Sequence, residues 1–272
     1  MLSNGKIELI ALDLDGTLLM ENGRIHPDNI PPIREAVARG IPVVLATGKT
    51  PWSAQELIET LGLVSPGVFS QGMVITDVGG TVKRLVTLDK GVTTAVLDFT
   101  AARNLPVNVY AADGLYATMD DHYRHVLHTK YREPLPVLSP DLRHQLDTLQ
   151  ITKLLVSDEV NNDVTRADLE RHLGDRAVVV QAVPEYIEIL PLNVTKWTGL
   201  RWLLNEMGID PAAVMAVGDG ENDLDMLRSV GLGVAMGNAS QAIKAAADVV
   251  VGSNEAAGVA EAIERFVLEI GH

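Results

Sequence analysis

The chain contains no cysteine among its 272 residues. Disulfide bonds and zinc–thiolate sites are therefore excluded, and a reducing compartment is compatible with the sequence. The chain also lacks any stretch near the roughly 18–20 unbroken apolar residues that a membrane-spanning helix needs. We do not expect its first residues to form a signal peptide, since Asp13 and Asp15 interrupt the early apolar run. We therefore expect a cytoplasmic protein that does not enter a membrane.

Basic residues are scarce in this sequence. Lys and Arg number 22 against 36 Asp and Glu, which leaves a formal net charge of −14 at pH 7. Long-range repulsion argues against nucleic acid and acidic membranes as partners. Hydrophobic residues reach 47%, which is ample for a buried core. The length suggests one large domain with an insert.

The most informative segment is Asp13-Leu14-Asp15-Gly16-Thr17-Leu18. It follows the apolar run of residues 7–12, which is typical of a buried parallel strand. Open α/β sheets bind their ligands at the carboxyl ends of such strands. On an extended backbone, the side chains of Asp13 and Asp15 point the same way and share one small volume. Two like charges so close need a cation or a shared proton, although a solvated Asp-Gly turn would also account for the segment alone.

A second acidic group follows the apolar run Val214–Val217. Residues 218–223, Gly-Asp-Gly-Glu-Asn-Asp, are predicted to form a loop that leads into a helix. Asp219 lies in the loop and Asp223 in the first helical turn, so both can face one crevice. Helix capping alone would account for Asp223. Together with Asp13, the loop supplies oxygen ligands of the kind that Mg²⁺ prefers.

Two further segments have donors suited to a phosphoryl group. The run of residues 41–46 is predicted to be a strand that ends at Thr47-Gly48, where a hydroxyl and a backbone N–H can donate to a phosphoryl oxygen. Lys196 lies at the start of a helix predicted to reach Met207. A cation at a helix N-terminus opposes the helix dipole, which favours a functional role for Lys196. An isolated Thr at a strand end is more often structural.

Strands and helices alternate at both ends of the chain, which predicts an α/β fold with a doubly wound parallel sheet in a Rossmann-like core. We expect this core domain to comprise residues 1–83 and 188–272. An inserted, smaller α+β domain with an open-faced sheet is expected over residues 84–187. The elements expected in the core are helices at 28–39 and 53–61; those expected in the insert are helices at 92–103, 140–149 and 163–173 and strands at 106–110, 115–118, 151–157 and 177–182.

Four segments, in this order, resemble the haloacid dehalogenase superfamily of aspartate-nucleophile phosphotransferases. They are Asp13–Leu18, Thr47-Gly48, Lys196 and Gly218–Asp223. Residues 233–239 and 253–259 narrow the resemblance to the Cof-type branch with a type IIB cap. The resemblance is close at both ends of the chain. In the middle it rests only on the length of the segment and on its pattern of strands and helices. It implies a Mg²⁺-dependent phosphatase, a phosphoric monoester hydrolase, that acts on small phosphorylated metabolites such as sugar phosphates, with the insert as a specificity cap.

The resemblance also implies a role for each motif residue. Asp13 would attack phosphorus and form an aspartyl-phosphate, and Asp15 would serve as general acid and base. Mg²⁺ would be bound by Asp13, the backbone carbonyl of Asp15 and Asp219. The other polar groups would surround the reacting phosphate: Thr47, Gly48 and Lys49 as phosphate-binding residues, Lys196 as a catalytic residue, and Asn222 and Asp223 to orient the metal's waters or Lys196.

Three positions depart from the family's pattern. Lys49 stands where many relatives carry Arg, which replaces a bidentate fork by a point charge. Ser70-Gln71-Gly72 stands where Asn-Gly is usual, and Thr195 replaces a common Ser beside Lys196. None of these changes touches the carboxylates, so they affect the expected substrate preference and not the reaction type.

Alternatives to a phosphatase remain at this stage. A phosphomutase or phosphotransferase of the same superfamily would share all four motifs. A non-catalytic protein that binds phosphorylated metabolites would be expected to have lost Asp13 or Asp219. The physiological substrate is not identified, and we expect a monomer or weak homodimer.

Three histidines of the insert, His122, His125 and His128, are spaced by three residues. A helix would place neighbours of this series side by side, but it would not direct all three at one ligand. A solvated surface is therefore favoured over a metal site, and any role of the three histidines stays open.

Overall fold

The computed structural model describes residues 6–269. Its backbone divides into two compact units, Met1–Arg84 with Thr195–His272, and Leu85–Val194. The chain returns from the second unit to the first after Val194. From the sequence, this return is expected between residues 187 and 188. That expected point lies inside strand β11 (Tyr186–Leu190), which pairs with β9 and β10 of the inserted sheet. The chain therefore leaves the insert only after this strand is complete.

A five-stranded parallel sheet forms the centre of the first unit, in the order β14-β13-β12-β1-β2. β1 pairs with β12 on one side and with β2 on the other, so that Ala11 lies beside both Ala216 and Val44. The parallel α/β sheet expected from the sequence is thereby confirmed. The strands are β1 (Leu9–Leu12), β2 (Val43–Leu45), β12 (Val214–Gly218), β13 (Leu232–Ala235) and β14 (Val249–Val250).

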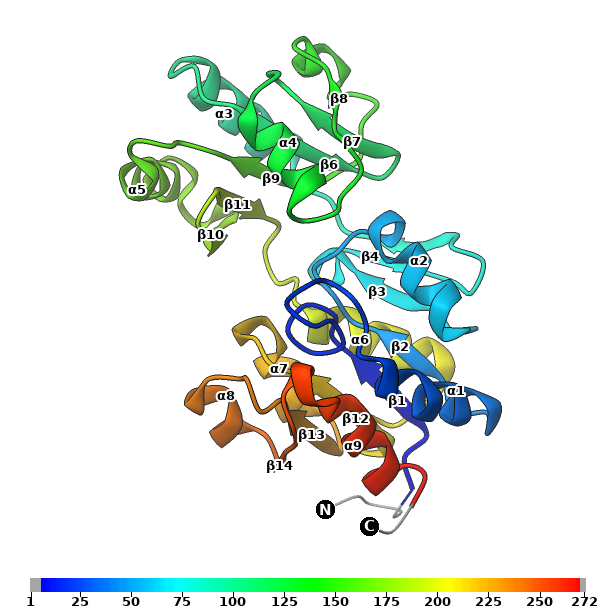
Figure 1. Ribbon diagram of the computed structural model, residues 1–272. Helices are drawn as coiled ribbons and strands as arrows, with labels where there is room; N and C mark the ends of the chain where they lie inside the picture. The colour runs from blue at the N-terminus through cyan, green and yellow to red at the C-terminus, as the bar shows by residue number, and fades with distance from the viewer. Residues whose placement is uncertain (1–5, 270–272) are drawn as a thin grey trace. The chain divides into compact units, whose positions relative to one another are not determined.

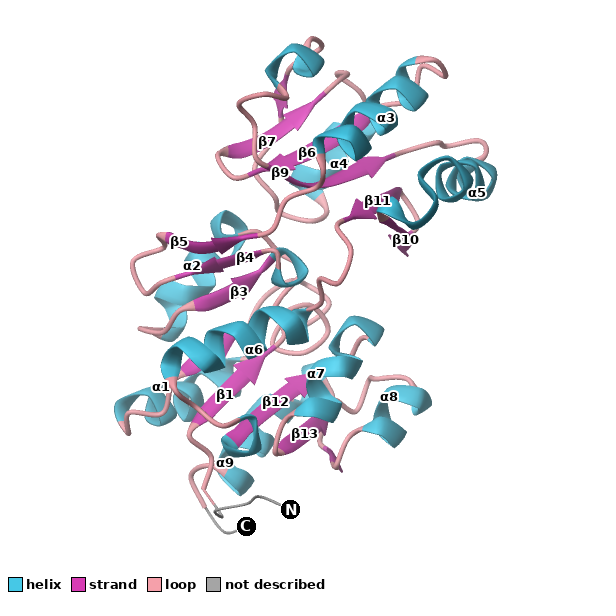
Figure 2. Ribbon diagram, turned by 180° about the vertical axis from the view of Figure 1, so that it is seen from behind, coloured by secondary structure: helices cyan, strands magenta, loops and turns pink. Residues whose placement is uncertain are grey.

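Helices cover both faces of this sheet, as Figures 1 and 2 show from opposite sides. On one face α1 and α9 pack against each other. On the other, apolar side chains of α6 and α7 pack against Leu9, Ala11 and Val214. Both faces of each central strand are therefore buried, which accounts for their continuous apolar runs. The helices are α1 (Ile30–Ala38), α2 (Pro51–Leu61), α6 (Lys196–Met207), α7 (Leu224–Ser229), α8 (Gln241–Ala246) and α9 (Gly258–Phe266).

A small three-stranded sheet, β3-β4-β5, follows α2 in the chain. A parallel bridge between Ala46 and Val68 connects it to the end of β2. A tight turn of 3-10 helix, Ser70–Gly72, joins β3 to β4. The strands are β3 (Gly67–Phe69), β4 (Val74–Thr76) and β5 (Val82–Leu85), the last of which carries the chain into the insert.

The second unit contains a six-stranded sheet in the order β10-β11-β9-β6-β7-β8, antiparallel except where β7 meets β8. Helices α3 (Lys90–Ala101) and α5 (Asn162–Leu173) cover one face and enclose its main apolar core. The strands are β6 (Val107–Ala111), β7 (Gly114–Ala117), β8 (Val137–Leu138), β9 (Ile151–Val156), β10 (Val178–Val183) and β11.

Two expectations for the insert are wrong. Residues 140–149 do not form a helix: a short 3-10 helix, Leu142–Gln145, and turns suffice to bury Leu142 and Leu146 in the core. The other face of the sheet is not fully open, because helix α4 (His122–Thr129) packs on part of it. Val126 and Leu127 of α4 lie against Tyr110 and other apolar side chains there. The apolar spacing at 142 and 146 is compatible with a helix but does not require one, because tertiary packing of the two leucines decides the backbone here.

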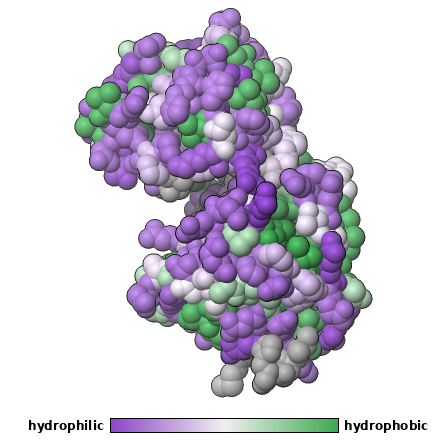
Figure 3. Space-filling model, viewed as in Figure 1, coloured by the Kyte–Doolittle hydropathy of each residue, from purple (hydrophilic) through white to green (hydrophobic). Residues whose placement is uncertain are grey.

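Hydrophilic side chains cover most of the face shown in Figure 3, in keeping with the net charge of −14. Within residues 6–269, no helix combines the length and the apolar composition needed to cross a membrane.

Candidate active site

Asp13 and Lys196 form the centre of the candidate active site. Asp13 directly follows β1, and its side chain is buried. Lys196 is the first residue of α6, because the side chain of Thr195 caps that helix. Its Nζ lies 2.6 Å from Asp13 Oδ1 and 2.7 Å from Asp223 Oδ1, and only 1% of its surface is exposed. The α6 cap thus holds one ammonium group between two carboxylates.

The burial of these charges shifts their proton affinities. Burial and the neighbouring Asp223 carboxylate raise the pKa of Asp13 to about 7, although Lys196 acts in the opposite direction. For Lys196, burial opposes the charge, but Asp13 and Asp223 outweigh it and raise the pKa to about 12. Burial also raises the pKa of Asp219. Lys196 therefore stays charged at neutral pH. Its single positive charge does not fully compensate the negative charge of the carboxylates around it.

Asp219 is held at the same place by two polar side chains from other segments. Thr17 Oγ1 donates to Asp219 Oδ1 at 2.9 Å. Asn238 Nδ2 donates to Gly16 O at 2.8 Å and lies 3.3 Å from Asp219 Oδ2. Gly16 has a φ of +79°, and a Cβ on it would lie 2.3 Å from Asp219 Oδ2. Only glycine fits where the Asp13–Leu18 segment passes this carboxylate.

The carboxylates of Asp13, Asp219 and Asp223 form a site that suits a divalent cation. One oxygen from each lies within 4.8 Å of the others, and this is the one such cluster within residues 6–269. Three ionised carboxylates against the single charge of Lys196 leave an excess of about two negative charges, if all are ionised. Hard oxygen donors with this charge excess match the requirements of Mg²⁺.

Asp15 has different surroundings from Asp13. The backbone is not extended after Leu12 but turns, with Leu14 O accepting from Thr17 N at 3.2 Å. Asp13 and Asp15 therefore do not lie two apart on an extended strand, the geometry that would point both side chains the same way. The side chain of Asp15 is 63% exposed, and its Oδ1 lies 3.1 Å from Lys49 Nζ. The structure pairs Asp15 with Lys49 and does not include its side chain in the acidic cluster.

Thr47 and Gly48 lie at the end of β2, as the sequence predicts. Thr47 is fully buried, and its Oγ1 accepts a hydrogen bond from Lys49 N at 3.1 Å. Because a hydroxyl also carries a proton, Thr47 keeps a donor for another acceptor. A Cβ added to Gly48 would lie 2.8 Å from Gln71 Nε2, so the Gln71 side chain would have to shift.

The loop of residues 219–223 brings Asn222 and Asp223 into the site in different ways. Asp223 is fully buried, and its Oδ2 accepts from the backbone N–H groups of Asp219 and Gly220 at 3.1 and 3.0 Å. Its other oxygen binds Lys196. Asn222 Nδ2 donates to Gln71 Oε1 at 3.2 Å.

Sequence reasoning assigned no role to three residues that the structure brings to this site, Thr17, Gln71 and Asn238. Each lies in a segment that the sequence had singled out, so a signal was present. What was missing was the partner of each side chain. Asp219 lies 202 residues after Thr17, and Asn222 lies 151 residues after Gln71.

The histidines of α4 have local partners in the insert. His125 Nε2 lies 3.2 Å from Asp120 Oδ1, and His128 Nδ1 lies 2.9 Å from Glu133 O. Two of the three histidines thus contact groups of the insert that lie near them in the chain.

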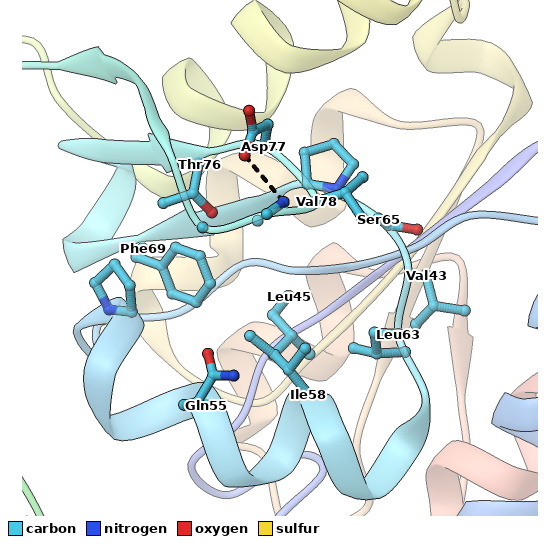
Figure 4. A pocket seen from close by; sticks show the side chains of 15 residues that line it. Val43, Leu45, Gln55, Ile58, Leu63, Ser65, Phe69, Thr76, Asp77 and Val78 are labelled. Atoms are coloured by element: carbon cyan, nitrogen blue, oxygen red, sulfur yellow. Dashed lines mark hydrogen bonds between the residues drawn. The ribbon is translucent and has the colours of Figure 1, made fainter.

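A separate cavity of about 130 Å³ lies under α2 and contains none of the motif residues (Figure 4). Apolar side chains such as Leu45, Ile58 and Phe69 line much of it. Its one charged lining residue is Asp77, which accepts from Gly79 N at 3.0 Å. None of the residues that line this cavity is basic, and its one carboxylate would repel a phosphate group.

Comparisons with known proteins identify the family of the chain. The family model of haloacid dehalogenase-like hydrolases matches residues 10–263. A Bacillus subtilis protein named as a 5-amino-6-(5-phospho-D-ribitylamino)uracil phosphatase is 30% identical over 262 residues, with 96% of each chain covered. An Arabidopsis thaliana protein named as the chloroplastic endoribonuclease YBEY is 35% identical over 272 residues, 96% of this chain. The chain spans only 47% of that protein's length.

A solved structure shows the same fold over nearly the whole chain. A haloacid dehalogenase-like hydrolase from Bacteroides thetaiotaomicron superposes with a TM-score of 0.87 at 28% identity, covering 96% of this chain and 99% of its own. A coverage of 96% means that the match extends through both units. The range 10–263 that the family model matches includes all four motif segments. The resemblance inferred from the motifs is confirmed, and the chain belongs to the haloacid dehalogenase-like hydrolases.

Proposed function

We propose that this hydrolase is a Mg²⁺-dependent phosphatase of small phosphorylated metabolites, sugar phosphates among them, and that it acts through an aspartyl-phosphate on Asp13. The observation that carries the proposal is the buried Asp13 carboxylate, bound to Lys196 and within 4.8 Å of oxygens from Asp219 and Asp223. The related Bacillus subtilis phosphatase is named for a small phosphorylated substrate, which supports this substrate class.

Asp13 is suited to the role of nucleophile. One of its carboxylate oxygens attacks phosphorus, and the bond from phosphorus to the substrate's alcohol oxygen breaks. Lys196 stabilises the ionised form of Asp13 through the 2.6 Å contact and also fixes its orientation. Mg²⁺, bound by Asp13 and Asp219 with the backbone carbonyl of Asp15, would supply positive charge that offsets repulsion between the carboxylate and the phosphoryl oxygens.

Asp15 is suited to proton transfer because it is exposed and lies outside the acidic cluster. Its carboxyl group donates a proton to the leaving alcohol oxygen. In the second half of the reaction a water attacks phosphorus, Asp15 accepts the water's proton, and the bond between phosphorus and Asp13 breaks. Inorganic phosphate is released, and both aspartates return to their starting state.

Donors around the phosphoryl group complete the site. The Thr47 hydroxyl, the Gly48 N–H and Lys196 can donate to the phosphoryl oxygens, where most of the stabilisation of phosphoryl transfer is applied. Lys49, which pairs with Asp15, would add positive charge beside them. Asp223 Oδ1 also accepts from Lys196 Nζ, at 2.7 Å. The inserted unit would act as the cap that reads the leaving group.

The decisive experiment replaces the nucleophile. Asp13→Asn should lower the release of phosphate from p-nitrophenyl phosphate by at least about a thousandfold at saturating Mg²⁺. Asp28→Asn removes an exposed carboxylate from the same unit and should leave the rate unchanged. Turnover by Asp13→Asn near the wild-type rate would exclude the aspartyl-phosphate. Transfer of phosphate within a hexose phosphate, without release, would identify a phosphomutase instead.

A further inference from the structure

The turn Ser70–Gly72 contacts three segments that carry motif residues: the one after β2, the start of α6 and the 219–223 loop. Ser70 N donates to Lys49 O at 2.8 Å, and Gln71 N donates to Thr47 O at 3.0 Å. A Cβ on Gly72 would lie 2.2 Å from Thr195 O, directly before Lys196. The turn is therefore packed against the phosphate-binding segment and against the cap of α6.

The backbone of this turn is strained at two residues that are not glycine. Ser70 has a φ of 49°, and Gln71 has φ and ψ values of 59° and 26°, in the left-handed region. Side chains other than glycine, asparagine and aspartate rarely adopt this conformation. Such strain persists where the surroundings hold a residue in place, and it is concentrated at functional sites.

The side chain of Gln71 reaches across the site with a free donor. Its Oε1 accepts from Asn222 Nδ2 at 3.2 Å, which fixes the amide plane. Its Nε2 lies 2.8 Å from the position that a Cβ on Gly48 would occupy. Within residues 6–269 this Nε2 makes no hydrogen bond. An oriented N–H₂ group thus lies close to Gly48.

We propose that Gln71 is an additional phosphate-binding residue. Asn222 holds the side-chain amide of Gln71 in place, and Gln71 Nε2 donates to a phosphoryl oxygen next to Gly48. The assignment rests on the proposed phosphatase function and adds a residue to it. A neutral donor suits this place, since it binds the phosphate without forming an ion pair with the nearby carboxylates. Gln71 also joins the phosphate-binding segment to the 219–223 loop, so both are ordered together.

Binding of inorganic phosphate in the presence of Mg²⁺, measured by calorimetry, tests this without requiring turnover. Gln71→Glu keeps the size of the side chain but replaces the donor by a carboxylate oxygen. Gln71→Gly removes the amide and relieves the positive φ, so it should be at least as stable as the wild type. Both should weaken phosphate binding about tenfold or more and raise KM for p-nitrophenyl phosphate similarly. Gln241→Glu, which adds the same charge at the exposed start of α8, should bind phosphate like the wild type.

The outcomes separate a ligand from a turn residue. Wild-type phosphate affinity in Gln71→Gly or in Gln71→Glu would overturn the proposal and leave Gln71 with a structural role. An equal loss in Gln241→Glu would also overturn it, because the effect would then be one of overall charge. If the wild-type enzyme releases no phosphate from any monoester, it is the proposed function that fails, whereas the phosphate affinities still decide the role of Gln71.

Discussion

Lys196 Nζ lies 2.6 Å from Asp13 Oδ1, although 183 residues separate the two in the chain. The contact is fully buried and includes Asp223 on the other side of the ammonium group. A buried charge is stable only when it is paired and hydrogen-bonded. The position of Lys196 at the first turn of α6, unfavourable for the helix dipole, is therefore offset by two carboxylates.

Removal of this lysine should destabilise the protein. Lys196→Met leaves Asp13 and Asp223 buried without their cation, and we expect a loss of about 3–5 kcal/mol in the free energy of unfolding at pH 8 in EDTA. Lys83→Met removes an exposed lysine that pairs with Asp77 and should cost about 1 kcal/mol or less. Urea denaturation measures both. Equal losses in the two variants would mean that the buried pair contributes little.

The close approach of Gly16 to Asp219 predicts a specific effect on metal binding. In Gly16→Ala the new methyl group meets Asp219 Oδ2, so the carboxylate must move, and the Mg²⁺ concentration for half-maximal activity should rise about tenfold or more. Gly80→Ala is a matched control, since its φ of +81° is equally unfavourable but nothing lies within 4 Å of the added Cβ. It should lose about 1 kcal/mol of stability and keep its Mg²⁺ requirement.

The raised pKa of Asp13 predicts a pH dependence of the metal-free protein. Its pKa is about 7 in the folded state and 3.8 in the unfolded reference, so between these values the folded state binds more protons. The free energy of unfolding should therefore fall as pH rises from about 4 to about 7. Urea denaturation in EDTA at pH 5, 6 and 7 should show this slope in the wild type, and Asp13→Asn should show less of it.

Added Mg²⁺ should remove most of that slope, because a bound cation favours the ionised carboxylate over the proton. The stabilisation by Mg²⁺ should therefore be larger at pH 7 than at pH 5. A wild-type slope equal to that of Asp13→Asn would show that Asp13 is not the group responsible.

Local patterns explain why much of the fold could be predicted. The central strands carry short apolar runs that end at polar residues, and parallel strands place such ends at one edge of the sheet. The sequence therefore predicts that Asp13, Thr47 and Asp219 lie at the same edge of the sheet. The insert is harder to predict from the sequence. The spacing of Leu142 and Leu146 is also that of a helix, and most residues of α4 are polar, so the sequence does not indicate that Val126 and Leu127 pack on the sheet.

The sequence by itself determined the parallel α/β core, the acidic segments at the strand ends and the membership of the family. These follow from short-range periodicity and from residue types at fixed spacing. Only the tertiary structure decided that Asp15 pairs with Lys49, that Thr17 and Asn238 hold Asp219, and that Gln71 contacts Asn222. The physical reason is that such contacts depend on how distant segments pack, and no local pattern encodes the partner of a side chain. Asp13 and Lys196 were each recognisable in the sequence, whereas the 2.6 Å between them is a property of the fold.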